Sequence, residues 1–489
     1  MQFSKKKQET KSMLMESLQN DLSNCSDFVV QKIVTESSGL EIYKLYFNML
    51  INMQIIDEEI LKPLANNLAS VNNTTDLQKL ITEGKIYHID IKVTTDKDKI
   101  IEAILDGCFA LVCEEQGYIF DTRNYSRRSI DEPANESVVI GPREGFIEAR
   151  TTNISLLRRR LQSPKLKVLD ETIGTETKTT VSILYMEGTA NPELVKDVVE
   201  RIKSIDIPAL ISITDFEEHM VERKYSIFPQ LISTEKPDKV AANIIEGKVA
   251  VVIDGFPMVY VMPAVFAMFM QAPEEYNINY FVSSFVRLIR YISTFLTLTL
   301  PGLYISVITF HQEMLPTTLA KSIIASKQDV PLPAYLEILI MLLAFEILLE
   351  AGNRMPKTAG QTVSIVGALI VGEAAVNAKF VSPAVVVIVA ASAICGFVIP
   401  SPDMANSVRL GRMFLVICAS IAGLYGMSLA LITAIYYLSG MTSFKTSYLK
   451  PFADNGGKAL LADTLIRTPS TKRKDKMVRW KVWELRLYV

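Results

Sequence analysis

Charged residues are distributed very unevenly along this 489-residue chain. Residues 281–440 hold only 16 of them, although the whole chain contains 51 Lys and Arg and 53 Asp and Glu residues. Such a long charge-poor stretch is typical of helices in hydrocarbon, whereas the remainder can fold in water. The sequence therefore predicts a cytosolic α/β region in about the first 270 residues, followed by an all-α polytopic membrane domain.

Charge balance and short motifs argue against several function classes. A net charge of −2 gives no field that would attract nucleic acid, so no nucleic-acid partner is expected. Phosphate-loop, dinucleotide-binding and HExxH patterns are missing, so we expect neither an enzyme nor a bound cofactor or metal. The five cysteines form no CxxC pair, and the N-terminus lacks the apolar run of a secretory signal. Both features favour a reducing, cytosolic location for the α/β region.

The α/β region contains an internal repeat. Residues 98–120 align without gaps on residues 238–260, at an offset of 140. In each copy an acid opens a short amphipathic helix, Gly107 or Gly247 ends it, and two apolar strands joined by a tight turn follow. An upstream pair of blocks has nearly the same offset. Chance similarity of short αβ units is the alternative, but the near-constant offset predicts two related α/β subdomains.

The composition changes divide the chain into six parts. They are a polar N-terminal tail (1–20), α/β subdomain 1 (21–140), a linker with a basic helix (141–175), α/β subdomain 2 (176–275), a transmembrane helical domain (280–444) and a basic cytosolic C-terminal tail (445–489).

Three uncharged runs are long enough to cross a bilayer as helices. Two further apolar segments contain charged residues or are too short for a complete span. The runs are 291–310, 380–402 and 413–444, the last of which is long enough to include a turn at the interface. Segment 335–349 contains Glu337 and Glu346, and 358–372 is short before Glu373. Basic residues collect at cytosolic ends of spans, and the basic tail favours four crossings, with 358–378 entering incompletely or lying along a cavity between copies. Pro301-Gly302 is expected to break the first span, although prolines are also common in ordinary membrane helices.

The segment 364–380 combines small residues with polar ones. Helix packing is expected at its small residues, Gly367, Ala368, Gly372, Ala374 and Ala375. Glu373 and Asn377 stand one turn apart, and an ionisable group in such a segment normally faces a bundle interior or a water-filled path. An ion path and structural hydrogen bonding both fit this pattern.

Two further groups of charged residues are candidates for coupling or interface contacts. They are the run Arg158, Arg159 and Arg160, and the stripe Glu346, Glu350 and Arg354 at a spacing of four. The run can bind anionic lipid, a partner or a neighbouring copy, and the stripe allows a helical ion pair. A solvated helix face for the run, and a helix end at the membrane interface for the stripe, are equally compatible.

Ordered sequence blocks resemble the A subunit of GerA-type germinant receptors, the nutrient sensors of bacterial endospores. The blocks are PREGFIE, LLRRRL, GTETKT, FPQ with TEKPD, DGFP, VRLIRY with LPGLYIS, FHQEMLPTTL, FEILLEAGNRMPK and IVGALIVGEAAVNAKFVSPAVVVIVA. The resemblance implies a membrane domain in the spore inner membrane, in contact with lipid. It also implies assembly of several copies with a transporter-like B subunit, which binds the nutrient, and with a C-type lipoprotein.

This resemblance implies a ligand-gated cation channel that triggers spore germination. We expect several copies to pack helix 363–378 around an axis, with Glu373 and Asn377 near the conduction path and Val366 or Leu369 as an apolar gate. Two alternatives stay open, namely a secondary transporter with a mid-membrane substrate site and a non-conducting receptor scaffold.

Overall fold

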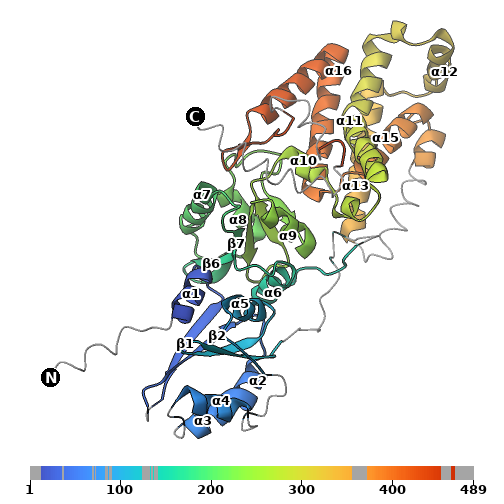
Figure 1. Cartoon of the computed structure of the whole chain (residues 1–489). Coiled ribbons are helices and arrows are strands. Elements are labelled where there is room, and N and C mark those ends of the chain that lie inside the picture. Colours follow the sequence, from blue (N-terminus) through green and yellow to red (C-terminus); the bar gives the residue numbers. More distant parts are fainter. Residues whose placement is uncertain are drawn as a thin grey trace. The chain divides into compact units, whose positions relative to one another are not determined.

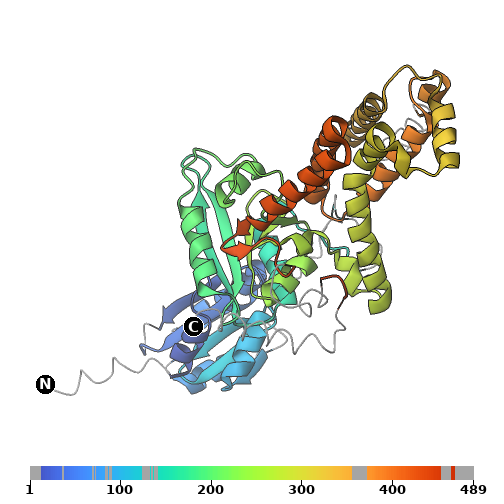
Figure 2. The same cartoon turned by 90° about the horizontal axis from the view of Figure 1, so that it is seen from above.

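The chain forms two compact units in the computed structural model, which describes residues 13–35, 38–68, 71, 73–82, 86, 91–123, 133, 136, 141–354, 372–452 and 464–467. The α/β unit consists of the chain up to Val221 together with Leu231–Pro263. The helical unit consists of Glu222–Gln230 and the described residues between Ala264 and Arg467. Both units can be followed in Figure 1, and from above in Figure 2.

The α/β unit contains two five-stranded antiparallel sheets with matching strand order. The first sheet is ordered β1 (Phe28–Val34), β2 (Glu41–Phe47), β4 (Phe109–Cys113), β5 (Gln116–Phe120) and β3 (Ile91–Thr94). The second is ordered β6 (Leu166–Ile173), β7 (Thr179–Met186), β9 (Val249–Ile253), β10 (Val259–Met262) and β8 (Ile232–Thr234). The two copies of the sequence repeat therefore occupy equivalent places in two related sheets.

Helices pack on these sheets through alternating strand residues. Those of the α/β unit are α1 (Met13–Asp21), α2 (Met53–Ile55), the π-helix η1 (Ile56–Leu61), α3 (Lys62–Asn67), α4 (Thr74–Thr82), α5 (Lys97–Leu105), α6 (Arg150–Arg160), α7 (Pro192–Lys203), α8 (Ile213–Met220) and α9 (Pro237–Ile245). In the first sheet Ile42 packs with Leu77 of α4, whereas the next residue, Tyr43, packs with Ile100 of α5. Because neighbouring strand residues face opposite ways, helices cover both faces of this sheet (Figure 1).

The two glycines predicted to end equivalent helices have the expected conformation. Gly107 follows α5 with φ +87°, and Gly247 follows α9 with φ +92°. A Cβ at these positions would lie 2.9 Å from the Leu50 carbonyl oxygen and 2.8 Å from that of Thr189. Glycine is therefore required in both copies by backbone conformation and by space.

Two elements of the α/β unit lie outside the expected subdomain boundaries. Helix α1 lies largely within the expected polar tail, and its Met15 and Leu18 are fully buried because they face the same side of a short helix. Strand β6 lies within the expected linker 141–175 and pairs with β7, so the second sheet begins before residue 176.

The helical unit is built around four long or apolar helices. Its elements are α10 (Phe266–Phe269), η3 (Pro273–Tyr276), α11 (Tyr280–Phe310), η4 (Gln312–Met314), α12 (Thr317–Lys327), α13 (Ala334–Arg354), a helical turn at 372–377, α15 (Pro383–Gly396), α16 (Pro402–Ser439) and the hairpin of β11 (Thr442–Ser443) with β12 (Thr446–Ser447). Its core joins Ile305, Leu342, Val389 and Val416, one residue each from α11, α13, α15 and α16.

Two helices among the described residues, α11 and α16, are long and apolar enough to cross a membrane by length and composition. The expected break at Pro301-Gly302 is wrong, because α11 continues through Pro301 as one 31-residue helix. A full span at 380–402 is not confirmed, since α15 has only 14 residues and therefore a length of about 21 Å.

The expected span 413–444 is not one straight helix either, because α16 breaks in its middle. Ala422 (φ −134°) and Gly423 (φ +56°) leave the helical conformation. Ser407 contacts the Ile227 carbonyl, and Gly440 contacts the Arg223 side chain. Residues 223–227 span at most about 14 Å, whereas an unbroken helix from 407 to 440 would measure about 50 Å. The second half of α16 therefore turns back along the first (Figure 1).

Candidate functional site

Pro301 leaves one helical carbonyl of α11 without its usual donor, because proline has no N–H group. This carbonyl belongs to Thr297, one turn earlier. The hydroxyl of Ser392 on α15 donates a hydrogen bond of 3.0 Å to it. Ser392 is completely buried, so its hydroxyl can satisfy the carbonyl without water.

Ser392 also belongs to a group of polar and charged residues that contact one another. We call this group the Glu346 cluster (Thr297, Glu346, Ser392, Arg409 and Arg412). Arg412 donates from Nη1 to Ser392 Oγ at 3.2 Å and from Nη2 to Glu346 Oε1 at 2.7 Å. Arg409 also donates to the Glu346 carboxylate, at Oε2. The cluster therefore joins α11, α15, α16 and α13 through polar contacts.

The Glu346 cluster carries more positive than negative charge. Arg412 is only 1% exposed, and Glu346 is its single carboxylate partner among the described residues while also binding Arg409. Removing one member of a buried ion pair leaves an uncompensated charge, which costs much more than the pair contributes. The cluster is consequently suited to holding four helices in one arrangement.

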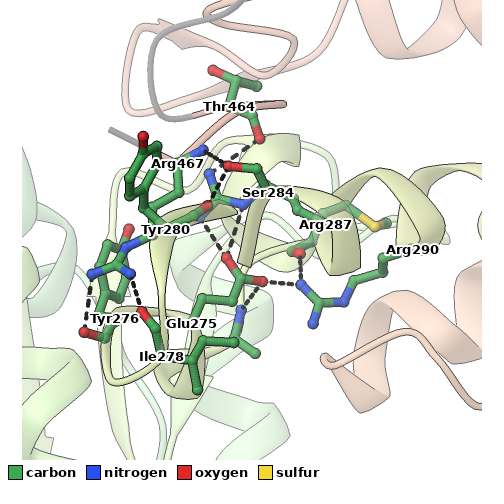
Figure 3. Close-up of polar contacts among 11 residues, drawn as sticks. Glu275, Tyr276, Ile278, Tyr280, Ser284, Arg287, Arg290, Thr464 and Arg467 are labelled. Carbon is green, nitrogen blue, oxygen red and sulfur yellow. Dashed lines mark hydrogen bonds and ion pairs between the residues drawn. The ribbon is translucent and has the colours of Figure 1, made fainter. Parts of the chain in front are cut away.

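A second buried group, the Glu275 cluster (Glu275, Arg287, Arg290, Thr464 and Arg467), lies at the start of α11 (Figure 3). Glu275 Oε2 accepts hydrogen bonds from Arg287 Nε at 2.8 Å and Nη2 at 2.5 Å, while Oε1 pairs with Arg290. All three side chains are at least nine-tenths buried. Arg287 and Arg290 are one turn apart on α11, so one carboxylate binds both.

The Glu275 cluster also binds the chain that follows α16. Arg287 donates to the Thr464 carbonyl at 3.2 Å, and the Arg467 backbone N–H donates to Ser284 Oγ at 3.1 Å. The Arg467 guanidinium donates to the Tyr276 carbonyl at 3.0 Å and lies 5.4 Å from the centre of the Tyr276 ring. Residues 464–467 are thereby fixed against the first turns of α11 (Figure 3).

Glu337, an acid that compromises segment 335–349 as a membrane span, is fully buried in the helical unit. Its Oε2 accepts a hydrogen bond of 2.8 Å from the Ser382 N–H at the start of α15. Lys327 Nζ lies 3.0 Å from Oε1. An opposite charge and a helix N-terminus thus compensate this carboxylate.

The structure places only part of the expected pore segment. Val366, Leu369, Gly367 and Ala368 lie outside the described residues. In the turn at 372–377, Gly372 is buried and Ala375 half-buried against the core, whereas Ala374, Glu373 and Asn377 are exposed. Glu373 and Asn377 therefore point away from the core of a single chain.

The other expected stripe separates into two environments. Glu346 belongs to the Glu346 cluster, whereas Glu350 and Arg354 form an exposed pair, with 2.7 Å between Arg354 Nη2 and Glu350 Oε1. Exposed pairs of this kind contribute little to stability. Among the described residues, the first residue of the stripe is therefore the one that contacts another helix through its charge.

The arginine run of α6 also separates by residue. Arg158 binds Asp27 through Nε at 2.5 Å and Nη2 at 2.7 Å, and both side chains are buried. Burial lowers the pKa of the Arg158 guanidinium, but Asp27 more than offsets this, so the pKa lies above its ordinary value. Arg160 pairs with Glu144 at 2.5 Å, and Arg159 is exposed. Arg158 is thus held inside the chain and is not available to a lipid surface.

Arg158 and its neighbours join the two sheets. Asp27 immediately precedes β1, whereas Arg158 Nη1 donates to the Leu166 carbonyl of β6 at 3.3 Å. Ser26 N–H donates to the Val168 carbonyl at 2.9 Å, which extends the contact along β6. The sheets are therefore linked by a buried ion pair and by backbone pairing.

Sequence reasoning missed the arginines and the serine that complete these clusters. Arg409 and Arg412, like Arg287 and Arg290, are three residues apart beside an apolar run. Such pairs beside apolar runs also serve as indicators of membrane topology, an interpretation that requires no partner in a buried site. The spacing itself was the available signal, because it puts both charges on one helix face.

The protein thus belongs to the class of chains that join a duplicated α/β unit to an apolar helical unit, here one with buried acid–arginine clusters. Residues 16–478 match the model of the Bacillus/Clostridium GerA spore germination protein family, and the chain belongs to this family. The expectation drawn from the sequence blocks is confirmed at this level.

Named relatives match along most of their length. Spore germination protein KA of Bacillus subtilis is 35% identical over 92% of this chain and 82% of its own. The Bacillus subtilis membrane protein YfkQ is 37% identical over 91% of this chain and 86% of its own. The N-terminal domain of the A subunit of the Bacillus megaterium spore germinant receptor GerK3 has 23% identity and a TM-score of 0.40, covering 52% of this chain and 94% of that domain.

Proposed function

We propose that this chain is the A subunit of a nutrient germinant receptor and that several copies form a ligand-gated cation channel in the spore inner membrane. Family membership and the germination relatives support a role in germination. By the resemblance, a transporter-like B subunit binds the nutrient and a C-type lipoprotein completes the receptor. The α/β region lies in the cytosol in this proposal.

The observation that carries the channel proposal is the exposure of Glu373 in a charge-poor part of the chain. An acid in such a region is costly against hydrocarbon and normally faces a bundle interior or water. Neighbouring copies would supply these surroundings, with Asn377 beside Glu373 and Val366 or Leu369 as the gate. Contact with lipid is supported by large exposed apolar side chains such as Phe285, Phe295, Ile421 and Ile432.

Reversal potentials test this proposal on the purified chain. The protein is reconstituted in planar bilayers under a KCl gradient, and Glu373→Gln and Asn377→Ala are compared with the unmodified chain. We expect cation selectivity and a reversal potential that moves toward zero in Glu373→Gln, because a carboxylate near the path attracts cations.

Glu313→Gln is the matched control, since Glu313 is an exposed acid of the same unit outside the proposed path. An unmodified chain that gives no conductance would support a non-conducting scaffold. Equal selectivity in Glu373→Gln and Glu313→Gln would remove Glu373 from the path.

A further inference from the structure

The loop between α8 and β8 leaves the α/β unit and becomes part of the helical unit. Residues Glu222–Gln230, which we call the strap, belong to the helical unit, although Val221 before them and Leu231 after them belong to the α/β unit. The chain passes to the helical unit a second time, between Pro263 and Ala264. The α/β unit is therefore covalently tied to the helical unit at both ends of the strap and after β10.

These connections arise from paired strands at one edge of the second sheet. Ile232, two residues after the strap, is the register partner of Val261, three residues before Ala264. Strand β8 is the edge strand of the sheet, and β10 is its neighbour. Two of the connections to the helical unit, before β8 and after β10, therefore belong to neighbouring strands of one sheet.

The strap contacts both halves of α16 near their open ends. Ile227 accepts a hydrogen bond through its carbonyl from Ser407 of the first half. Arg223 donates to the Gly440 carbonyl after the second half, and its guanidinium lies 5.1 Å from the centre of the Tyr437 ring. The Gln230 side chain in turn bonds to the Arg223 backbone at 2.8 Å and 3.1 Å. The strap thereby holds together two helix halves that meet at the break of Ala422 and Gly423.

Ser443 binds the chain where it leaves the helical unit, at Gln230, and where it enters that unit again, at Ala264. Its hydroxyl donates to the Gln230 carbonyl at 2.8 Å and accepts a hydrogen bond of 3.1 Å from the Ala264 N–H. Ser443 is 2% exposed and belongs to the hairpin that directly follows α16. One buried hydroxyl is therefore shared by the end of the strap, the start of the chain toward α11 and the end of α16.

We propose that the strap and Ser443 form a coupling junction through which movements of β8 and β10 reach the second half of α16. The two halves of α16 are joined by a non-helical break, so the second half can change its angle without unwinding the first. Its C-terminal end is bound to the strap and is followed by the hairpin that contains Ser443. The strap leads into β8, and Ala264, which Ser443 binds, follows β10. The inference rests on the proposed function only for its effect on conduction.

Hydrogen–deuterium exchange of the full chain in detergent tests the junction independently of conduction. Ser443→Ala removes both hydrogen bonds, and we expect exchange at residues 438–447 to rise about fivefold or more, with the first half of α16 unchanged. Ser439→Ala is the control, because in the described part of the chain the exposed Ser439 hydroxyl bonds to the Ile435 carbonyl of its own helix alone. Ser443→Thr keeps a hydroxyl and should restore protection. Equal exchange in the two alanine variants would overturn the proposal.

A second comparison tests transmission from the sheet. Val261→Ala removes buried volume from β10, and Val112→Ala removes the same volume from a fully buried position in the first sheet. We expect faster exchange at 438–447 in Val261→Ala alone, and no further increase when it is combined with Ser443→Ala. An equal response to both valine substitutions would contradict transmission through the junction. If the unmodified chain does not conduct while these exchange results hold, the channel proposal fails and the junction stands.

Discussion

The hydroxyl of Ser392 lies 3.0 Å from the carbonyl oxygen of Thr297, the helical carbonyl that Pro301 leaves without a donor. This relationship explains how α11 passes through a proline without ending. It also links the site of the proline to the charged residues of the Glu346 cluster, because the same hydroxyl accepts a hydrogen bond from Arg412. The cost of the proline in one helix is thus offset by a side chain of another.

Ser392→Ala should lower the stability of the helical unit by about 1–3 kcal/mol, because a buried carbonyl loses its donor. Pro301→Ala restores an N–H that can bond the Thr297 carbonyl, so Ser392→Ala should cost less in that background. Thermal unfolding in detergent of the two single variants and the double variant gives the coupling. Equal costs in both backgrounds would show that the carbonyl is satisfied in another way.

Glu346→Gln should lower stability by about 3 kcal/mol, because the buried Arg412 loses its carboxylate partner. Glu350→Gln is the matched control on the same helix, since it removes only the exposed pair with Arg354 and should change stability by less than about 0.5 kcal/mol. Unfolding midpoints at equal detergent concentration provide the comparison. Similar midpoints for the two variants would argue against a structural role of the Glu346 cluster.

Asp27→Asn should loosen the contact between the two sheets of the α/β unit. It leaves Arg158 buried without a carboxylate, for which we expect a loss of about 3–5 kcal/mol. Limited proteolysis should then cleave the chain faster between the two sheets. Arg159→Gln, at an exposed position, should leave the cleavage rate unchanged.

Cys108 and Cys113 should make the first sheet less stable at high pH. Burial raises the pKa of the Cys108 thiol to about 11, with a smaller contribution from Asp121, and burial and then Glu114 raise that of Cys113 to about 12. An unfolded thiol ionises near pH 8.5, and the stabilisation by the neutral thiols is fully present below this pH. Because the folded-state values are higher, this stabilisation should be lost progressively as the pH rises toward about 11–12.

Native-state alkylation followed by mass spectrometry checks this expectation. At about pH 9 both thiols should stay unmodified in the folded chain and react after unfolding. Replacing both cysteines with alanine should flatten the decline of stability with pH. Rapid native labelling of either residue would show that its thiol is not protected.

Sequence patterns predicted those features of the structure that depend on residues close together in the chain. The repeat required glycine after two equivalent helices, and positive φ at Gly107 and Gly247 follows from that. The pairing of Glu350 with Arg354 likewise needed only helical spacing. These features depend on residues a few positions apart, which a single sequence displays directly.

The remaining features depend on partners distant in the chain. Nothing near Pro301 in the sequence indicates that Ser392 will replace its missing donor, so a break was expected there. Arg412 lies 66 residues from Glu346, and the sequence around either residue does not indicate the other as its partner. The length of the run 413–444 allows a turn, but the sequence does not place it at Gly423, because glycine is common in apolar helices and its positive φ is a property of the folded chain.

The turn in α16 determines where the residues after this helix lie. Because the second half of that helix returns, Thr464 and Arg467 can reach the residues that begin α11. The start of α11 and residues 464–467 therefore lie at the same end of the helical unit, so we expect any bilayer that this unit traverses to be crossed an even number of times. A protease or antibody that recognises a tag placed after Arg467 should consequently act from the same face of the membrane as one directed at the segment just before Tyr280.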